Sequence, residues 1–362
     1  MTAGRADLVV AGSGSLARSV CHSLAAARPA PAAVVVVARS GAKAAEVCEV
    51  AGTRAALSGS PARFRPVECD LADGDRLAAV LGEARPRAVL GCASVQSPWE
   101  RTAAPSAWTE LLAAAGFGLA LPLHGLLALR LAAAVEAATP GAAYVNACYP
   151  DAVNPLLRAA GHRVAFGIGN VAILAATLQA ALGLPDQRRL QVLAHHWHLH
   201  APDDPAEEAL AWCDGRPVED VGRLVAGQRA VGGAELNLVT GHAAALLLRD
   251  LLAGAEVATS LPGPGGLPGG YPVVASLDGA RVEAPPGMTV DEAVARNRRW
   301  AERDGVVVED DGRVVVSAAA AAAVRPHLPA LAGGFSAADA VEVAGDLLAL
   351  RDWLRAEPAA QP

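Results

Sequence analysis

The sequence predicts an α/β protein in which a doubly wound parallel sheet is followed by a C-terminal mixed α+β domain. Up to residue 155, short continuous apolar runs alternate with helical patterns, which is typical of a parallel sheet covered by helices on both faces. Hairpin signals come late in the chain, for example at Asp310-Asp311-Gly312. The 362 residues suit two domains. We therefore predict a first domain at 1–155 and a second domain at 156–362.

The first strand, at 8–11, and the helix that follows it through Ala27 enclose the most specific motif, Gly12-x-Gly14-x-x-Ala17. Gly12 allows a tight turn, Gly14 lets a pyrophosphate approach the backbone, and Ala17 lets the helix pack closely on the strand. The free N–H groups at the start of the helix would then hold phosphates. We therefore expect a Rossmann domain that binds a dinucleotide, and the residues that contact it are Gly12, Ser13, Gly14, Ser15 and Leu16.

The second strand, at 34–38, ends where nicotinamide cofactors are distinguished. An NAD site would place an Asp or Glu there to hold the ribose 2′-hydroxyl. This chain has Arg39 and Ser40 instead, with Lys43 close behind. A guanidinium can hold a 2′-phosphate through paired hydrogen bonds, so the sequence predicts NADP(H). The alternative is that Arg39 is a solvated loop charge.

The third strand, at 64–69, and the fourth strand, at 88–92, each lead into polar residues. Asp70 is expected either to face the adenine end of the cofactor or to cap the next helix. The loop that begins with Ala93 and Ser94 leaves the carboxyl end of the fourth strand. Ligands of open α/β sheets bind at these ends, so the loop should lie along the ribose and nicotinamide.

The fifth strand, at 142–147, follows a long apolar helical region at 106–138 and also ends in polar residues. Asn146 is a candidate to hydrogen-bond a substrate oxygen or the nicotinamide carboxamide. Asp151 is a candidate to orient a histidine. The alternative for both residues is ordinary turn chemistry, because Asn and Asp near Pro are common in loops.

A strand predicted at 191–200 carries a histidine cluster that includes His196, His198 and His200. Side chains alternate along a strand, so these three would share one face. Histidine titrates near neutral pH and can donate the proton that hydride transfer requires. We expect His196, and after it His198, to be catalytic rather than structural. The same spacing would suit zinc or manganese, but no second ligand pair of short spacing is visible, and we assign no metal site.

The remaining elements of the second half are predicted from periodicity and turn signals. The chain should continue with helices at 209–230 and 241–252, a Gly/Pro-rich loop at 261–270, strands at 271–276 and 279–283, a helix at 291–303, a hairpin at 306–309 and 313–317, and helices up to 355.

Composition limits the partners. The formal net charge of −7 and the absence of a basic run argue against nucleic acid or an anionic membrane. Six scattered cysteines without a C-x-x-C pair, and a first strand that starts almost at once, indicate a cytoplasmic protein with reduced thiols. The apolar stretches at 111–129 and 164–185 are predicted to be buried helices. Because its Ala-rich helices are more apolar than a monomer's surface requires, we expect a homodimer.

In order, these features resemble the lactate/malate dehydrogenase superfamily over roughly residues 7–303. Segment 161–170 resembles the turn into that family's interdomain helix, His195 and His196 fall where it carries its catalytic histidine, and segment 237–242 resembles the start of its substrate-lining helix. Segment 171–176 lacks the family's histidine-orienting Asp and its carboxylate-gripping Arg. The N-terminal domain also has features similar to saccharopine reductases, namely Asp70 and the loop at 94–99.

The resemblance implies a nicotinamide-dependent oxidoreductase. We therefore expect an NADPH-dependent reductase that transfers a hydride to a small carbonyl or imine substrate, with a histidine as proton donor. Two other functions are compatible with the sequence. One is a nicotinamide-using lyase or hydrolase that is redox-neutral or metal-assisted, which a bound metal would indicate. The other is a non-catalytic NADP-binding sensor, which tight binding without turnover would indicate.

Overall fold

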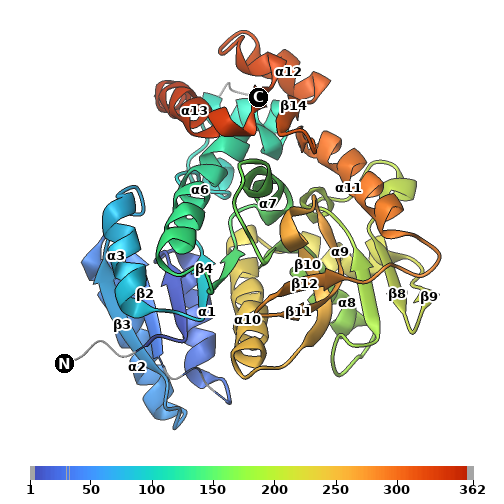
Figure 1. The fold of residues 1–362 in the computed structure, drawn as a ribbon. Helices are drawn as coiled ribbons and strands as arrows, with labels where there is room; N and C mark the ends of the chain where they lie inside the picture. The colour runs from blue at the N-terminus through green and yellow to red at the C-terminus, as the bar shows by residue number, and fades with distance from the viewer. Residues whose placement is uncertain (1–4, 30, 32, 357–362) are drawn as a thin grey trace.

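The computed structural model describes residues 5–29, 31 and 33–356, and its first part is built around one parallel sheet (Figure 1). The strand order is β3-β2-β1-β4-β5-β6, and all neighbouring strands are parallel. The strands are β1 (Leu8–Ala11), β2 (Ala33–Ala38), β3 (Arg63–Glu68), β4 (Ala88–Gly91), β5 (Ala143–Asn146) and β6 (Phe166–Gly167). The predicted α/β fold class, with a doubly wound parallel sheet, is confirmed.

Alternate side chains of the central strand enter two separate cores. Leu8 and Val10 pack with helices on one face of the sheet, whereas Val9 and Ala11 pack with helices on the other. This explains why these strands have no polar side and read as continuous apolar runs. The first face is covered by α1 (Ser15–Ala26), α2 (Gly41–Leu57) and α10 (Gly233–Leu252), and the second by α3 (Gly74–Ala84), α6 (Leu121–Ala138) and α7 (Pro150–Ala159).

The second part contains three small antiparallel sheets, as expected of a mixed α+β domain. Their strands are β7 (Leu190–Leu193), β8 (Leu210–Cys213) and β9 (Arg216–Pro217), then β10 (Val257–Pro262), β11 (Gly270–Ser276) and β12 (Gly279–Val282), and finally β13 (Val306–Val308), β14 (Arg313–Val316) and β15 (Phe335–Ser336). The strands expected at 271–276 and 279–283 and the hairpin expected at 306–317 are confirmed.

The remaining helices lie mostly around these sheets. They are α4 (Glu100–Ala103), α5 (Ala107–Ala115), α8 (Asn170–Ala181), α9 (Val221–Arg229), α11 (Val290–Asp304), α12 (Ala318–Val324) and α13 (Ala340–Arg355). Short 3₁₀ turns are η1 (Phe117–Ala120), η2 (His196–Leu199), η3 (Pro205–Glu207), η4 (Pro264–Gly266), η5 (Leu331–Gly333) and η6 (Ala337–Asp339). The C-terminal helices lie away from β2 and β3, with α13 beside α6 and α12 beside α5 (Figure 1).

Three predicted elements differ from the structure. The strand expected at 191–200 ends at Leu193, and the histidines follow it in a bend and in η2. The helix expected at 209–230 is a short hairpin before α9, because Asp214 and Gly215 both adopt positive φ and form a tight turn. The helical region at 106–138 is interrupted at Gly116, whose φ is 90°.

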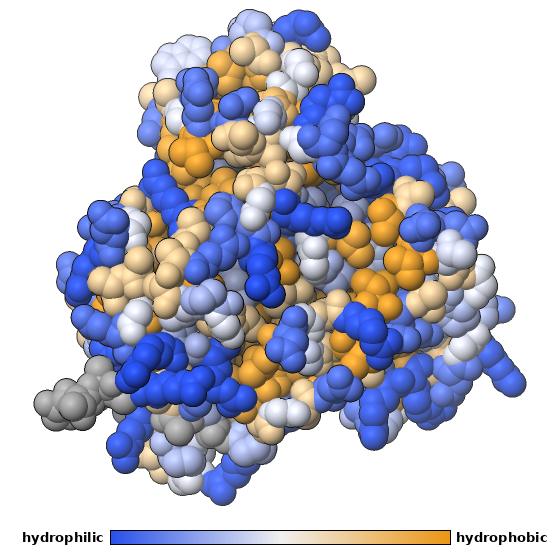
Figure 2. Space-filling view, in the orientation of Figure 1, coloured by the Kyte–Doolittle hydropathy of each residue, from blue (hydrophilic) through white to orange (hydrophobic). Residues whose placement is uncertain are grey.

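Two further expectations concern the boundaries of the molecule's parts. The predicted domain boundary at residue 155 falls inside α7, and the sheet continues beyond it with β6; the boundary remains a prediction. Segment Phe117–Ala138 is long and apolar enough to cross a membrane, but 83% of its most apolar window is buried inside the protein. Such burial is what a core helix shows. Figure 2 shows apolar side chains in small patches between hydrophilic ones on one face.

Candidate active site

A cavity of about 610 Å³ lies at the carboxyl ends of β1, β4 and β5, where ligands of open α/β sheets bind. The phosphate-loop motif, the loop after β4, the start of α10 and the histidine turn η2 all contribute to its wall. The residues used below that line it are Gly14, Ser15, Leu16, Ser94, Val95, Gln96, Trp99, Phe117, His124, Cys148, Tyr149, Ile173, His196, Leu199, His200, Leu236, Asn237 and Arg355.

The glycine motif has the geometry that a dinucleotide requires. Gly12 has a φ of +135°, and a Cβ there would lie 3.1 Å from the carbonyl carbon of Cys92, so the turn needs glycine. Gly14 has an ordinary φ of −73°, and a Cβ there would meet nothing within 4 Å. Open space above Gly14 is what an approaching pyrophosphate would fill.

The start of α1 also suits an anion. No side chain caps its N-terminus, and no acidic residue lies in its first turn. Asn237 of α10 donates a hydrogen bond to Ser15 Oγ at 2.7 Å, and the Ser13 carbonyl accepts one from Arg18 Nε at 3.1 Å. These contacts hold the loop that would carry the phosphates. The residues of this site therefore fit a dinucleotide.

The residues expected at the adenosine end lie on the surface. Arg39 is exposed at the carboxyl end of β2. Ser40 caps α2 by accepting a hydrogen bond from the Lys43 N–H. Asp70 is exposed and accepts from the Ala72 N–H, whereas the N-cap of α3 is Asp73. The alternative in which Asp70 caps the next helix is therefore wrong by three positions.

The loop after β4 faces the cavity. Ser94 lines it, whereas Ala93 contributes a carbonyl that accepts from Cys148 Sγ at 3.3 Å. Ser94 Oγ lies 3.0 Å from His124 Nδ1 and accepts a hydrogen bond from the Gln96 N–H. Burial lowers the pKa of His124 to about 3, so this ring is neutral at physiological pH.

His196 lies in the cavity wall at the centre of an aromatic and acidic cluster. Its ring stacks on Phe117 with 4.4 Å between centroids, and Tyr149 meets it edge-on at 4.8 Å. Its Nδ1 lies 2.9 Å from Oδ2 of Asp304, the last residue of α11. Tyr149 donates its hydroxyl proton to the same oxygen at 2.7 Å. Since Nδ1 is held by Asp304, Nε2 is the nitrogen left for a ligand.

The charges in this cluster stabilise each other. Burial alone would lower the pKa of His196, but the Asp304 carboxylate outweighs it and raises the pKa above its usual value. Burial would raise the pKa of Asp304, but the attraction of His196 and the Tyr149 hydrogen bond lower it to about 2. The ion pair between the two residues is thus favoured in the folded protein.

Asp151 holds His196 through the backbone. Its Oδ1 accepts a hydrogen bond from the His196 N–H at 2.8 Å, and its Oδ2 is buried without a hydrogen-bond partner among the described residues. Burial raises the pKa of Asp151 to about 6. The expected orienting contact to the imidazole ring is made by Asp304 instead.

Two expected site residues lie elsewhere. Asn146 is buried and is used within its own turn: its amide donates to the Cys148 carbonyl and to Asn154 Oδ1, and its Oδ1 accepts from the Cys148 N–H. His198 accepts the His195 N–H at Nδ1, and its ring faces Trp300 with 4.4 Å between centroids. Neither residue lines the cavity.

The expected shared face of His196, His198 and His200 is wrong for a simple geometric reason. η2 has about three residues per turn, so its side chains do not alternate as they would on a strand. Within residues 5–29, 31 and 33–356, no three His, Cys, Asp or Glu side chains are grouped so as to hold a metal ion.

Asp304 was not predicted from the sequence, because it lies 108 residues from its partner. Its position carries one unusual signal: an acidic residue in the last turn of a helix opposes the helix dipole. Tight packing holds it in place. A Cβ on Gly116 or Gly118 of the η1 region would lie 2.6 or 2.8 Å from the Asp304 carbonyl oxygen.

No protein-family model and no curated protein sequence matches this chain. Solved structures do. Malate dehydrogenase from Salinibacter ruber has a TM-score of 0.53 and 14% identity, over 82% of this chain and 94% of that chain. Malate dehydrogenase from Picrophilus torridus in its apo form has a TM-score of 0.53 and 14% identity, over 83% of this chain and 95% of that chain. Lactate dehydrogenase from Eimeria maxima with NADH and oxamate has a TM-score of 0.51 and 13% identity, over 83% of this chain and 92% of that chain.

These likenesses show the fold. They confirm the layout that resembles lactate and malate dehydrogenases, with a Rossmann-like parallel sheet followed by a second part that contains small antiparallel sheets. The features similar to saccharopine reductases remain a prediction.

Proposed function

We propose that this protein is an NADP(H)-dependent reductase of a small carbonyl or imine compound, with His196 as the proton donor. The observation that supports it most is that one cavity contains both the Gly14 phosphate loop and the His196–Asp304 pair. A nicotinamide would therefore lie in the same space as a buried acid. The NADH-containing lactate dehydrogenase among the similar structures makes this use of the fold plausible.

The cofactor would lie along the carboxyl edge of the sheet. Gly14 and Ser15 would hold the pyrophosphate, and Arg39 at the end of β2 would hold the 2′-phosphate. Ser94, in the loop after β4, would lie along the ribose and nicotinamide. When bound, the cofactor supplies the hydride, and this chain's residues supply orientation and the proton.

His196 would complete the reduction of a carbonyl. As the bound cofactor reduces the carbonyl carbon, His196 Nε2 would donate its proton to the carbonyl oxygen, which would give an alcohol. Asp304 stabilises the protonated ring beforehand, and water returns the proton afterwards. Asp151 fixes the backbone of His196, so the ring is held from two sides. Phe117 covers one face of the ring and limits its contact with water.

Separate substitutions of His196 and His198 test which residue donates the proton. His196→Ala should lower kcat by about 10²–10⁴-fold and leave NADPH affinity nearly intact, since the ring acts on substrate and not on cofactor. His198→Gln is the matched control, because His198 is buried in the same turn but does not line the cavity. Equal turnover in wild type and His196→Ala would refute the assignment. Tight NADPH binding without turnover of any carbonyl or imine would instead indicate a sensor.

Cofactor preference is tested by Arg39→Ala. We expect NADPH to bind more tightly than NADH by about 1.5–3 kcal/mol, the range for hydrogen bonds to charged groups, and the variant to lose most of this difference. Arg63→Ala is the control, because Arg63 is exposed at the opposite end of the neighbouring strand. An NADH affinity equal to or above that of NADPH in the wild type would contradict the proposal.

We also propose a homodimer in the cytoplasm. Helices α8 and α10 line a second cavity of about 900 Å³, and two apolar side chains beside it are exposed, Leu238 by 59% and Val239 by 42%. Exposed apolar groups next to a groove are typical of a protein interface. None of the six cysteines forms a disulfide in the structure, which suits a reducing compartment.

A further inference from the structure

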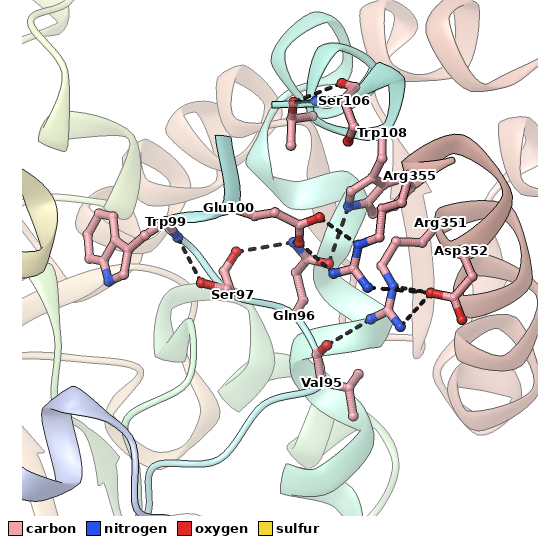
Figure 3. A network of polar contacts seen from close by, with 11 residues as sticks. Val95, Gln96, Ser97, Trp99, Glu100, Ser106, Trp108, Arg351, Asp352 and Arg355 are labelled. Carbon is pink, nitrogen blue, oxygen red and sulfur yellow. Dashed lines mark hydrogen bonds and ion pairs between the residues drawn. The ribbon is translucent and has the colours of Figure 1, made fainter. Parts of the chain in front are cut away.

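The loop after β4 is fastened to the C-terminal helix by a network of polar contacts (Figure 3). Arg351 of α13 donates from Nη1 to the Val95 carbonyl at 2.7 Å. Gln96 donates from Nε2 to Glu100 Oε2 at 2.9 Å and accepts from Trp108 Nε1 at 3.3 Å. The wall of the cavity on this side is therefore held in one arrangement by α13.

Arg355, at the end of α13, is the one arginine among the described residues that line the cavity, and no lysine, aspartate or glutamate of these residues lines it. Its guanidinium is already occupied. Nε and Nη2 each lie 2.6 Å from one oxygen of Glu100, and Nη1 lies 3.4 Å from Asp352 Oδ1. All three nitrogens thus face carboxylates, as Figure 3 shows. Arg351 also pairs with Asp352, so two cations balance two anions here.

The position of Glu100 favours a stable ion pair with Arg355. Its side chain is buried, only 9% exposed, and both of its oxygens accept from Arg355. Arg355 holds the pKa of Glu100 below its usual value, although burial works in the opposite direction. Two parallel N–H···O bonds to a buried carboxylate are the strongest arrangement available to an arginine. A ligand carboxylate would have to compete with it.

The other titratable groups of the cavity offer no free positive charge. Burial lowers the pKa values of His124 and His200, so both rings are neutral at physiological pH. The charge of a protonated His196 is balanced by Asp304. Apolar side chains also line the cavity, beside uncharged polar ones such as Ser94 and Gln96; the apolar ones are Trp99, Phe117, Ile173, Leu199 and Leu236.

We propose that the cavity selects an uncharged aldehyde or ketone with an apolar or aromatic body, and that Glu100 is the residue that excludes carboxylates. This inference rests on the proposed reductase function and narrows its substrate class. A carboxylate that left water for this cavity would find no unpaired cation, and burial of an unpaired charge is strongly unfavourable. A neutral carbonyl has no such penalty and can still accept the proton of His196.

The test compares benzoylformate with its methyl ester, which lacks the negative charge and carries one added methyl group, with NADPH as reductant. In the wild type, kcat/KM should be at least about tenfold higher for the ester, the low end of the range for a hydrogen bond to a charged group. Glu100→Gln keeps the shape of the side chain, but the glutamine has no negative charge to pair with Arg355. The ratio of acid to ester should then rise at least about tenfold.

Glu110→Gln is the matched control, since Glu110 is exposed on α5 and its loss removes the same charge from the protein. It should leave the ratio of acid to ester as in the wild type. A fall in the melting temperature shows whether Glu100→Gln loses the fold. Arg355→Gln then serves as the second variant, in which the acid should remain excluded because no cation is released.

Calorimetric binding of both compounds to the complex with NADP⁺ separates the two proposals. If neither compound is reduced but the ester binds more tightly than the acid, the reductase proposal fails while the charge selection stands. Equal or tighter binding of the acid to the wild type overturns the charge selection, whether or not the enzyme turns over. An unchanged ratio in Glu100→Gln overturns the role given to Glu100.

Discussion

Replacement of Asp304 by Asn is the perturbation that the geometry of the site makes most informative. The carboxylate lies 2.9 Å from His196 Nδ1 and 2.7 Å from the Tyr149 hydroxyl, and its side chain is only 6% exposed. Asparagine keeps the size of the side chain and can still accept one hydrogen bond. What the variant loses is the negative charge that stabilises the protonated ring.

The expected size of the effect follows from that loss. A hydrogen bond to a charged group contributes about 1.5–3 kcal/mol. At about 1.4 kcal/mol for each tenfold change in rate, Asp304→Asn should lower kcat by about 10- to 150-fold. The NADPH affinity should hardly change, because Asp304 lies behind His196 and does not line the cavity.

The pH dependence of the reduction rate should shift in a definite direction in this variant. His196 must carry its proton to act as an acid, so the rate should fall as the pH rises through its pKa. In the wild type this fall should lie above the ordinary value of 6.5, because Asp304 raises the pKa of His196. In Asp304→Asn, burial lowers the pKa of His196 with only Asp151 left to oppose it, so the fall should move to lower pH.

The assay is steady-state oxidation of NADPH, followed across the pH range with saturating carbonyl substrate. Asp310→Asn is the control, because this exposed aspartate follows the neighbouring strand β13 and pairs only with Arg298 among the described residues. It should retain both the rate and the profile. The reasoning is refuted if Asp304→Asn keeps the wild-type kcat and the same pH profile.

Three further predictions follow from the structure. Gly14→Ala should fold normally, since the φ of −73° suits alanine and the space is open, but it should bind NADPH at least about tenfold more weakly. Gly12→Ala should instead lower the melting temperature. Calorimetry of both variants checks this, and unimpaired NADPH binding by Gly14→Ala would count against the phosphate site. Burial raises the pKa of Asp151 to about 6, so the contribution of this group to stability is present below about pH 4 and is lost as the pH rises through 6. Asp151→Asn should therefore flatten this part of the wild-type stability profile. Identical denaturation midpoints of the two proteins across pH 4–7 would contradict this prediction. Light scattering should give the mass of two chains, and Leu238→Glu should reduce it to one; a wild-type mass of one chain would exclude the homodimer.

The first half of the fold could be predicted because burial on both faces leaves a direct trace in the sequence. Val34 to Val37 are buried, and alternate residues of this strand enter different cores. No solvent-facing position interrupts the run. The hairpins at 271–283 and 306–317 were likewise marked by local turn residues.

The errors arose where short segments carry conflicting local signals. Residues 210–213 continue an apparent helical pattern, but the positive φ values of Asp214 and Gly215 turn the chain back on itself. The histidine cluster follows the apolar residues of β7 without a break, so the sequence predicts a single strand over both. Strand periodicity therefore gave the wrong partners for His196.

The candidate site was predictable only where it is local. The glycine motif and the loop after β4 lie within short segments, and the structure brings both to the cavity. The partner of His196 comes from the end of α11, and the partner of Glu100 comes from the end of α13, 255 residues away. No sequence pattern links residues at such separations. Only the packing of α11 against η2, and of α13 against the segment after β4, brings these partners together.

A crystal structure of the protein with NADP⁺ tests the central claim most directly. We expect the pyrophosphate on Gly14 and Ser15, the 2′-phosphate beside Arg39, and the nicotinamide in the cavity, with room for a small carbonyl between it and His196 Nε2. The nicotinamide bound away from His196, or the dinucleotide bound outside this cavity, would contradict the proposed reductase site.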